Sequence, residues 1–349
     1  CVLYYNKFIK KKYSEKMSTQ SLSLDEIYTL AKKTLIHNGC DELNAEAVAK
    51  TVTFAERDGS VSHGLFRIPG YIAALKSKKV KGNARPTNNF LTNNIIKVDG
   101  DYGFAPTAIQ VGIPALVETT SKHGVGVLAI TNTHHFAALW HETEALAEKD
   151  LIGIACTAYM PSVAPAGATK PLFGTNPISF AWPRKNDTPV VYDMATASMA
   201  MGEVQVAARD GHKVPKGTGL NKDGEQTEDP SEIANGGVLL PFGGYKGSAI
   251  AMMVELLAAG LVGDMFSFEA KEADNKDGGP ARGGEFIMAL SPQLIAGDGW
   301  NEHAEKFFKQ MESLDGVRLP GNRRHNNRKD KGPRNINTAL VEKIRSLID

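Results

Sequence analysis

The sequence predicts a fold of the α/β or α+β class, and three observations support this prediction. Amphipathic helical segments and short apolar strand segments intermix along the chain, they follow no internal repeat, and no low-complexity tract interrupts them. The length of 349 residues, with 42% apolar and 23% charged residues, is sufficient for two or three domains with sizeable cores.

The first helices can be placed from local signals. Ser23 and Glu26 form a capping box, in which the hydroxyl and the carboxylate satisfy reciprocal backbone donors, so a helix begins there and ends near Asn38-Gly39. A second helix is expected over about 44–55, and a short third helix follows the polar segment 57–71.

The central and C-terminal segments alternate between strand and helix patterns. The expected strands are 95–99, 125–130, 152–157, 178–182 and 190–192. The expected helices are 104–123 with Gly124 as its cap, 136–149, a small-residue helix 247–262 packed on all sides, 300–314 and 337–348. The segments expected to be loops are 161–177, an exposed acidic excursion over 215–237, and 269–284.

Composition and charge exclude several function classes. The net charge of +1 gives no electrostatic reason to expect a nucleic acid or a membrane surface as partner. Cys1, Cys40 and Cys156 are odd in number and lack metal-ligand spacing, which favours a reducing, cytoplasmic location. Residues 1–16 contain no secretory or membrane-spanning stretch, and Met17 is a plausible start, so they are interpreted as a disordered extension. A basic targeting element is the alternative.

Two adjacent histidines are the most informative feature of the chain. His134 and His135 follow the apolar run 126–130 and precede the small-residue segment 136–138. Consecutive strand residues point to opposite faces, so a packed core explains only one of the two imidazoles. Polar groups are seldom buried without a purpose. A binding site is therefore expected where this strand ends.

The common nucleotide-binding and catalytic motifs are absent from the sequence. Gly124-Val-Gly126 precedes a strand and Gly217-Thr-Gly219 lies in the acidic excursion, so neither has the context of a dinucleotide-binding turn. The sequence has no Walker loop and no nucleophile elbow, and none of its nine histidines has metal-ligand spacing. No metal is expected.

The segment Ser62-His63-Gly64 with Arg67 combines residues suited to a small anion. If it begins a helix, His63 and Arg67 are four residues apart and share one face. Arginine can hold a carboxylate with two hydrogen bonds while the imidazole moves a proton. A capping serine beside solvated charges is an equally consistent interpretation.

Four further segments have both a functional and a purely structural interpretation. They are the turn Gly174–Pro177, the segment Asp193–Ser198 followed by the carboxylate of Glu203, the glycine-rich helix start Pro241–Ser248, and the arginine-rich turn Arg318–Arg324. Backbone donors, a helix start with a lysine, and guanidinium groups all suit an anionic ligand. The structural alternatives are an ordinary turn, a solvated carboxylate, a tight glycine turn and a solvated basic loop.

In this order, the segments resemble the malate/L-lactate dehydrogenase family, whose members bind a nicotinamide cofactor without a Rossmann fold. The motifs that carry the resemblance are Ser62-His-Gly64 with Arg67, Thr133-His-His-Phe-Ala137, Gly174-Thr-Asn-Pro177, Asp193-x-Ala-Thr-x-Ser198 and Gly243-Gly-Tyr-Lys-Gly247. Each motif is weak alone, but together they are specific, and the resemblance extends from about Leu24 to the C-terminus.

The resemblance implies a sulfolactate dehydrogenase-like α/β fold and its organisation. A central, mostly antiparallel sheet domain over 126–300 would bind NAD(P)H. A substrate-side lobe of helical and mixed structure would combine 17–125 with the returning C-terminal segment 301–349. The family also implies a homodimer whose active site lies between the subunits.

Within the family, the sequence is most similar to the branch that reduces Δ1-piperideine-2-carboxylate to L-pipecolate and Δ1-pyrroline-2-carboxylate to L-proline. The matching stretches are Arg57–Ser60, Phe66–Tyr71, His134–Trp140, Met252–Gly260 and Arg318–Gly321. At the position of Glu203 the hydroxyacid dehydrogenases carry Lys and the imine reductases carry Asp, and an acidic group there would stabilise a protonated imine. The alternatives are a 2-hydroxyacid dehydrogenase acting on malate, L-lactate or ureidoglycolate, and a non-catalytic protein that retains the binding site.

The resemblance also implies roles for individual residues. His63 would be the proton donor, assisted by Ser62 and Glu203, and Arg67 would anchor the carboxylate of a cyclic imino acid with His134 beside it. The residues expected to bind NADPH, or NADH, are Thr133, His134, His135, Phe136, Ala137, Thr175, Asn176, Lys246, Arg318, Gly321, Arg323 and Arg324. The three arginines would suit the 2′-phosphate of NADPH.

Overall fold

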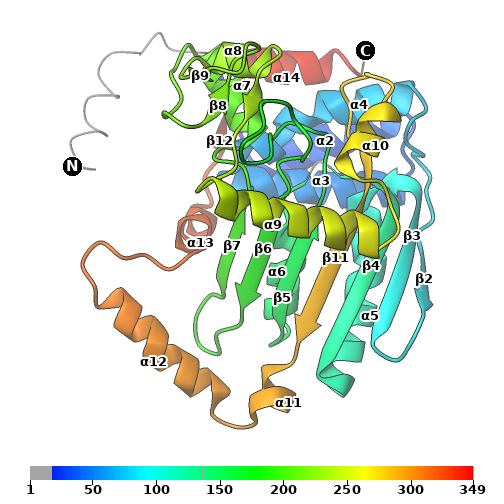
Figure 1. Ribbon diagram of the computed structural model, residues 1–349. Coiled ribbons are helices and arrows are strands. Elements are labelled where there is room, and N and C mark those ends of the chain that lie inside the picture. Colours follow the sequence, from blue (N-terminus) through cyan, green and yellow to red (C-terminus); the bar gives the residue numbers. More distant parts are fainter. Residues whose placement is uncertain (1–17, 136, 349) are drawn as a thin grey trace.

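A seven-stranded sheet forms the centre of the computed structural model, which describes residues 18–135 and 137–348. The strand order is β2-β3-β4-β11-β5-β6-β7, and every neighbouring pair is antiparallel except β3 and β4. The strands are β2 (Thr87–Phe90), β3 (Ile95–Phe104), β4 (Val125–His134), β5 (Ile152–Thr157), β6 (Ile178–Trp182), β7 (Val190–Met194) and β11 (Arg282–Leu290). This mostly antiparallel sheet, flanked by helices, confirms the expected fold class (Figure 1).

The parallel pair β3 and β4 requires a crossover, which the helix α5 (Ala105–His123) provides. Gly112 lets α5 approach the sheet closely, because a methyl group there would come within 2.7 Å of the Leu128 side chain. The helix ends at Gly124, whose φ of 84° lies in the left-handed region that glycine adopts freely. Together with α6 (Trp140–Ala147), α5 covers the apolar residues of β3, β4 and β11.

Helices from both ends of the chain form a second layer around a shared apolar core. They are α2 (Leu24–His37), α3 (Glu42–Arg57), α4 (Ile68–Lys76) and α14 (Thr338–Arg345). The capping box of α2 is confirmed, since the Ser23 hydroxyl accepts a hydrogen bond from the Glu26 backbone at 3.1 Å and the Glu26 carboxylate accepts one from the Ser23 backbone at 2.8 Å. The strands β1 (Thr19–Leu22) and β12 (Arg334–Asn337) pair antiparallel, which brings the two ends of the described chain side by side.

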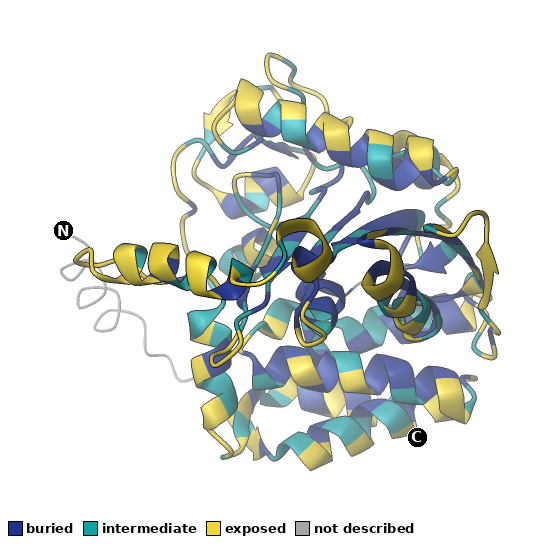
Figure 2. Ribbon diagram, turned by 90° about the horizontal axis from the view of Figure 1, so that it is seen from below, coloured by how far each residue is buried: buried dark blue, intermediate teal, exposed yellow. Residues whose placement is uncertain are grey.

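The remaining elements surround the sheet. They are α7 (Met201–Arg209), α8 (Pro230–Ala234), the small sheet of β8 (Gly219–Leu220), β9 (Gln226–Thr227) and β10 (Val238–Leu239), α9 (Tyr245–Glu255) with the π-helical turn η3 (Leu256–Leu261), α10 (Ser267–Glu272), α11 (Pro292–Ala296), α12 (Trp300–Glu312) and α13 (Asn322–Lys329). In Figure 2, buried residues concentrate on the strands and on the inward faces of the helices, and α12 is largely exposed.

Several expected elements differ from those observed. The helix expected over 136–149 is limited to α6, and the segment 269–284 contains the end of α10 and the start of β11 rather than loop alone. The segment 215–237 is not a simple excursion, because β8, β9 and α8 enclose buried apolar residues such as Ile233. The helix expected over 247–262 is not packed on all sides: Met252, Leu256 and Leu261 are 52%, 53% and 65% exposed.

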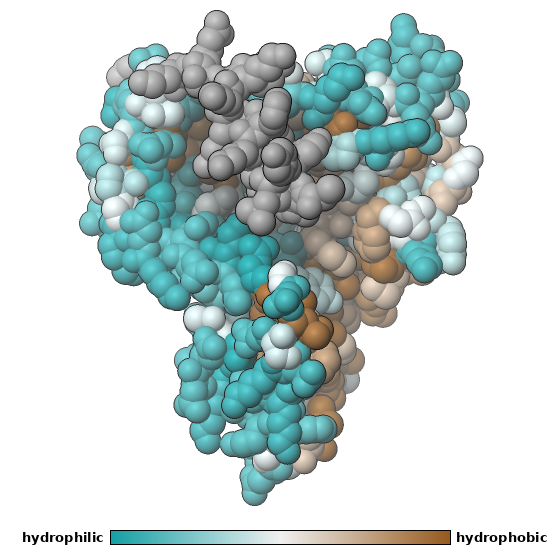
Figure 3. Space-filling model, turned by 90° about the vertical axis from the view of Figure 1, so that its left-hand side faces the viewer, coloured by the Kyte–Doolittle hydropathy of each residue, from teal (hydrophilic) through white to brown (hydrophobic). Residues whose placement is uncertain are grey.

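The helices α11 and α12 form an extension that projects from the body of the molecule (Figure 1). Hydrophobic residues lie along one side of this extension in Figure 3, and the exposed ones include Leu294, Ile295, Phe307 and Leu314. None of the helices formed by residues 18–348 has both the length and the apolar character needed to cross a bilayer.

Candidate active site

A cavity of about 470 Å³ lies where the N-terminal helices meet the central sheet, a size typical of ligand-binding sites. Its wall combines segments that are far apart in sequence: the turns before α4, the end of β4, the segment after β5, the segment before β6 and the start of α7. Six of the residues that the resemblance implicated in catalysis or binding line this cavity: Ser62, His63, Arg67, His135, Ala137 and Thr175.

Two 3-10 turns, η1 (Val61–His63) and η2 (Leu65–Arg67), carry the first group of these residues. The segment does not begin an α-helix, because two turns joined at Gly64 stand there instead, yet His63 and Arg67 still line the same cavity. The Ser62 hydroxyl lies 3.1 Å from Nδ1 of His63 and orients the imidazole.

A buried carboxyl group from α3 holds these turns in place. Oε1 of Glu56 accepts a hydrogen bond from the backbone N–H of Leu65 at 2.7 Å. Gly64 is required beside it, because a methyl group at that position would overlap the Glu56 carboxyl group. Burial raises the pKa of Glu56 to about 7, although the Leu65 hydrogen bond and Arg334 oppose this shift. Neither the hydrophobic pattern of the sequence nor its motifs had indicated a role for Glu56.

Electrostatics keep the His63 imidazole neutral over a wide pH range. Burial is the main cause that lowers its pKa to about 3, and the charges of Arg67, His135 and His141 lower it further. An anion bound to Arg67 would offset the positive charge that helps to lower the pKa of His63. The basicity of His63 therefore depends on what occupies the cavity.

Arg67 presents a cation to the cavity in a confined setting. Its guanidinium carbon lies 5.6 Å from the ring centre of Phe66, and burial lowers its pKa from the usual value. Gly202 at the start of α7 packs against it, since a methyl group there would lie 3.4 Å from Nη2 of Arg67 and 3.4 Å from Cβ of Ser62. Helix α7 thus approaches the turn that carries Ser62 and Arg67.

The adjacent histidines serve different cavities, as the alternation along a strand predicts. His135 lines the main cavity, whereas His134, the last residue of β4, lines a smaller one with Lys79, Tyr102 and Arg282. Burial lowers the pKa of His134 to about 4. A role for His134 beside the substrate has no support from this placement, and Phe136 lies outside the described residues.

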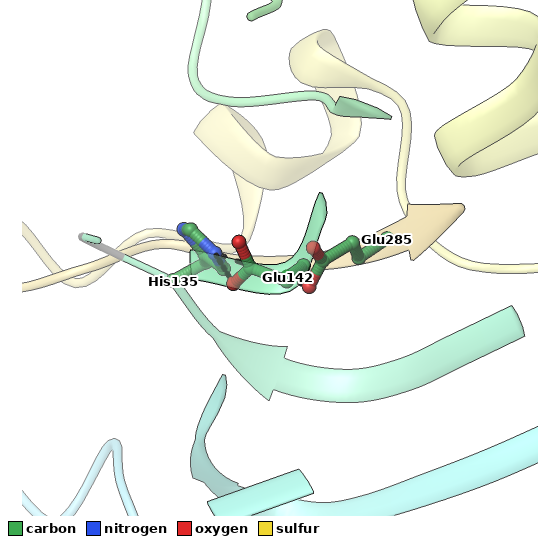
Figure 4. A group of neighbouring side chains, drawn as sticks. All are labelled: His135, Glu142 and Glu285. Atoms are coloured by element: carbon green, nitrogen blue, oxygen red, sulfur yellow. Dashed lines mark ion pairs between the residues drawn. The ribbon is translucent and has the colours of Figure 1, made fainter. Parts of the chain in front are cut away.

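Behind His135 lies a group of buried acids that was not expected from the sequence. Nε2 of His135 is 3.9 Å from Oε1 of Glu142, on α6, and 3.9 Å from Oε2 of Glu285, on β11 (Figure 4). Both glutamates are 1% exposed. Burial, and then the charge of Glu142, raise the pKa of Glu285 well above its usual value. One ligand atom from each of the three residues falls within 4.8 Å of the others, an arrangement that a metal ion could also use.

Other expected residues lie outside the main cavity. The Asn176 amide is buried and donates hydrogen bonds to Ala251 and Glu255, and the Thr133 hydroxyl donates to the carbonyl of Gly283. Glu203 is exposed, on the side of α7 opposite to Met201, Gly202 and Gln205, which line the cavity. The remaining ones are Lys246, which is exposed on the first turn of α9, and Arg318, Gly321, Arg323 and Arg324 at or near the start of α13. Their roles stay predictions.

Two helix starts fit the phosphates of a dinucleotide. Helix α7 begins at the cavity and α9 begins after Gly243 and Gly244, and neither helix has a side-chain cap. The two glycines have φ of 57° and 65°, and a methyl group at either would meet nothing within 4 Å. Uncapped backbone N–H groups in open surroundings are good donors to phosphate oxygens.

Comparisons with known proteins agree in family and in fold. The malate/L-lactate dehydrogenase family model matches residues 22–345. The Δ1-pyrroline-2-carboxylate reductase of Ancylobacter novellus is 41% identical over 307 residues, covering 87% of this chain and 90% of the relative. The Δ1-pyrroline-2-carboxylate/Δ1-piperideine-2-carboxylate reductase of Pseudomonas syringae pv. tomato is 41% identical as well, covering 88% and 90%.

Solved structures of related proteins have the same fold. The crystal structure of Δ1-piperideine-2-carboxylate reductase from Pseudomonas syringae superimposes with a TM-score of 0.90 at 40% identity, over 94% of this chain and 100% of that one. The sulfolactate dehydrogenase of Methanocaldococcus jannaschii gives 0.85 at 28% identity, over 94% and 96%. These similarities confirm the non-Rossmann fold that the motifs predicted.

Proposed function

Because the chain belongs to the malate/L-lactate dehydrogenase family, as its motifs predicted, we propose that it is a nicotinamide-dependent reductase of cyclic imino acids. The reactions are the reduction of Δ1-piperideine-2-carboxylate to L-pipecolate and of Δ1-pyrroline-2-carboxylate to L-proline. Relatives named for these substrates, at about 41% identity over most of the chain, support this choice over the hydroxyacid dehydrogenases.

The observation that carries the proposal is the joint placement of Ser62, His63 and Arg67 on the wall of one cavity. The Arg67 guanidinium can pair with the substrate carboxylate through two parallel hydrogen bonds. His63, held by Ser62, lines the same cavity and can exchange a proton with a ligand bound there.

The cofactor, when bound, supplies a hydride to the carbon of the C=N bond. The protein contributes orientation and a proton. Arg67 fixes the carboxylate, and this anion offsets the positive charge that helps to keep the pKa of His63 near 3. Substrate binding therefore raises the basicity of His63, so that the imidazole can take up a proton and deliver it to the ring nitrogen.

We extend the proposal to the cofactor, the assembly and the location. We favour NADPH over NADH because Arg318, Arg323 and Arg324 lie at or near the start of α13, where the first two could meet a 2′-phosphate, while Arg324 donates to the carbonyl of Val191. The apolar residues exposed on α9 and η3 support a homodimer. The buried free thiols of Cys40 and Cys156 are consistent with a reducing cytoplasm.

A substrate panel tests the proposal. Δ1-Piperideine-2-carboxylate, Δ1-pyrroline-2-carboxylate, pyruvate and oxaloacetate are compared under identical conditions with NADPH and with NADH, and kcat/KM is determined for each pair. The cyclic imines are expected to have the highest values. Preferred turnover of pyruvate or oxaloacetate would refute the imine assignment and favour a 2-hydroxyacid dehydrogenase.

A further inference from the structure

The carboxyl groups of Glu142 and Glu285 are buried behind the cavity wall in an unusual state. Oε2 of Glu142 and both carboxyl oxygens of Glu285 have no hydrogen-bond partner among the residues that the structure describes. A buried carboxyl group without partners is destabilising, so such a pair is seldom kept without a function. The ring of His135 separates the pair from the main cavity, with Nε2 turned towards the carboxyl groups (Figure 4).

Neighbouring cations do not neutralise this pair. Arg328 is engaged by Asp58 and Glu144, to which it donates four hydrogen bonds of 2.6–2.8 Å. Arg324 donates to the carbonyl of Val191 and lies over the ring of Trp140. Neither guanidinium group has a hydrogen bond to Glu142 or Glu285.

The other groups that face the pair add negative charge or are neutral. Asp193 accepts a hydrogen bond from the backbone of Trp140, and burial followed by the charge of Glu142 raises its pKa to about 6, although the charge of Arg324 opposes this shift. Cys156 faces Glu285 from β5, and burial followed by that charge raises the pKa of its thiol to about 12. Burial lowers the pKa of the neighbouring His141 imidazole.

Burial and the charge of Glu142 raise the pKa of Glu285, because a second negative charge a few ångströms from the first is costly in a buried site. The pair therefore favours one negative charge over two. Nε2 of His135 has no hydrogen-bond partner in the described part of the chain and lies 3.9 Å from a carboxyl oxygen of each glutamate. The negative charge there favours the tautomer with its proton on Nε2, which leaves Nδ1 without a proton.

We propose that Glu142 and Glu285, buried behind His135, act through its imidazole as positioning residues that make the cavity select a ligand with a positively charged ring nitrogen. The inference rests on the proposed function, because it names the determinant that would favour a protonated imine over a ketone. His63 supplies the proton, and the charge behind His135 keeps it on the ring nitrogen while hydride adds to the neighbouring carbon. Protons balance, since the iminium N–H becomes the amine N–H.

The decisive measurement compares two ligands that differ only in this charge. L-Pipecolate has a protonated ring amine, and (S)-tetrahydropyran-2-carboxylate has the same ring and carboxylate with an uncharged oxygen. Calorimetric titration in the presence of NADPH avoids turnover, because pipecolate has no oxidant there. The full-length protein is expected to bind pipecolate about tenfold to hundredfold more tightly than the oxygen analogue, the range for one charge acting at short distance.

A single negative charge on the pair makes a specific prediction for variants. Glu142→Gln and Glu285→Gln each leave one carboxyl group, which can carry the single charge, so each should keep most of the preference for pipecolate. The double variant Glu142→Gln/Glu285→Gln removes the charge and should reduce the preference at least tenfold. The matched control is Glu148→Gln/Glu302→Gln, in which both acids are exposed, and it should bind both ligands as the wild type does.

Several outcomes would overturn the inference. An unchanged ligand ratio in the double variant would show that the pair does not act on the cavity. If the double variant fails to fold, His135→Asn, which keeps both acids but removes the imidazole, must lose the preference instead. A rise in Tm with Zn²⁺ or Mn²⁺ that the double variant lacks would show that these atoms hold a metal rather than a proton.

The ligand ratio also separates this inference from the proposed function. If the wild type reduces only 2-oxo acids, the imine assignment fails, but the binding ratio still reports on the carboxyl pair. If the wild type reduces imines and the double variant keeps the same ratio of imine to pyruvate kcat/KM, only the inference fails.

Discussion

Replacing Glu56 by Gln should make the stability of the protein less dependent on pH. The Glu56 carboxyl group is 3% exposed and accepts the Leu65 N–H at 2.7 Å, beside the turn that carries His63. Glutamine has the same shape and retains an acceptor oxygen for this hydrogen bond. The substitution therefore removes a titrating group while it preserves the local geometry.

The magnitude follows from the shift of the pKa from 4.5 to about 7, which burial causes. Because the folded state holds this proton more tightly than the unfolded state, the stabilisation is complete below the unfolded pKa and is lost as the pH rises through 7. A shift of this size corresponds to about 3 kcal/mol, of which about 2 to 3 kcal/mol is lost between pH 5 and pH 8. The Glu56→Gln variant has no titrating group at this position, so its stability should not show this pH-dependent loss.

Urea denaturation at pH 5 and pH 8 measures the effect. The difference in unfolding free energy between variant and wild type should become more favourable to the variant by about 2 to 3 kcal/mol on going from pH 5 to pH 8. Other titrating groups, such as His63, contribute equally to both proteins and cancel. The exposed Glu148→Gln is the control and should show no such change. A difference that is the same at both pH values would refute the assignment of a raised pKa to Glu56.

Three further predictions concern the cavity. His63→Ala should lower kcat for imine reduction by about 10²- to 10⁴-fold with an unchanged Tm, as expected for loss of a proton donor, and a loss below tenfold would contradict that role. Arg67→Lys keeps the charge but cannot form paired hydrogen bonds with a carboxylate, so KM for the imine should rise by about tenfold or more while kcat falls less; an unchanged KM would place the carboxylate elsewhere. Glu203 lies outside the main cavity, but the role that the family resemblance implies for it predicts that Glu203→Lys raises the ratio of keto-acid to imine turnover, and an unchanged ratio would count against that role.

Much of the fold could be predicted because its signals are local. The capping box at Ser23, the helix stop at Gly124 and the apolar runs of β4, β5 and β6 each depend on a few neighbouring residues. The buried face of α9 and η3 could not be assigned, because small and apolar residues occur all around this helical segment and the sequence does not show which of them meet another element. Met252 and Leu256 are therefore exposed where a fully packed helix was expected.

The site was predictable only in part, for a related reason. Ser62, His63 and Arg67 are close in sequence, so their shared wall follows from local geometry. Glu142 and Glu285 come from α6 and β11, and only the sheet order β4-β11-β5 brings them together behind His135. One signal was visible: a glutamate within the apolar strand sequence of 282–290 is unusual, since buried acids generally need a partner.

The distribution of charge around the cavity gives a physical reason for a zwitterionic substrate. Arg67 supplies the positive charge on one part of the wall, and the Glu142–Glu285 pair lies behind His135 on another. A protonated cyclic imino acid has a carboxylate and a charged ring nitrogen on adjacent atoms, so it can satisfy both charges at once. A 2-oxo acid satisfies only Arg67 and leaves the buried negative charge without a partner, which in a site of low dielectric is the costlier outcome. Selectivity for imines then follows from the unpaired acid behind the cavity wall as much as from contacts to the ring.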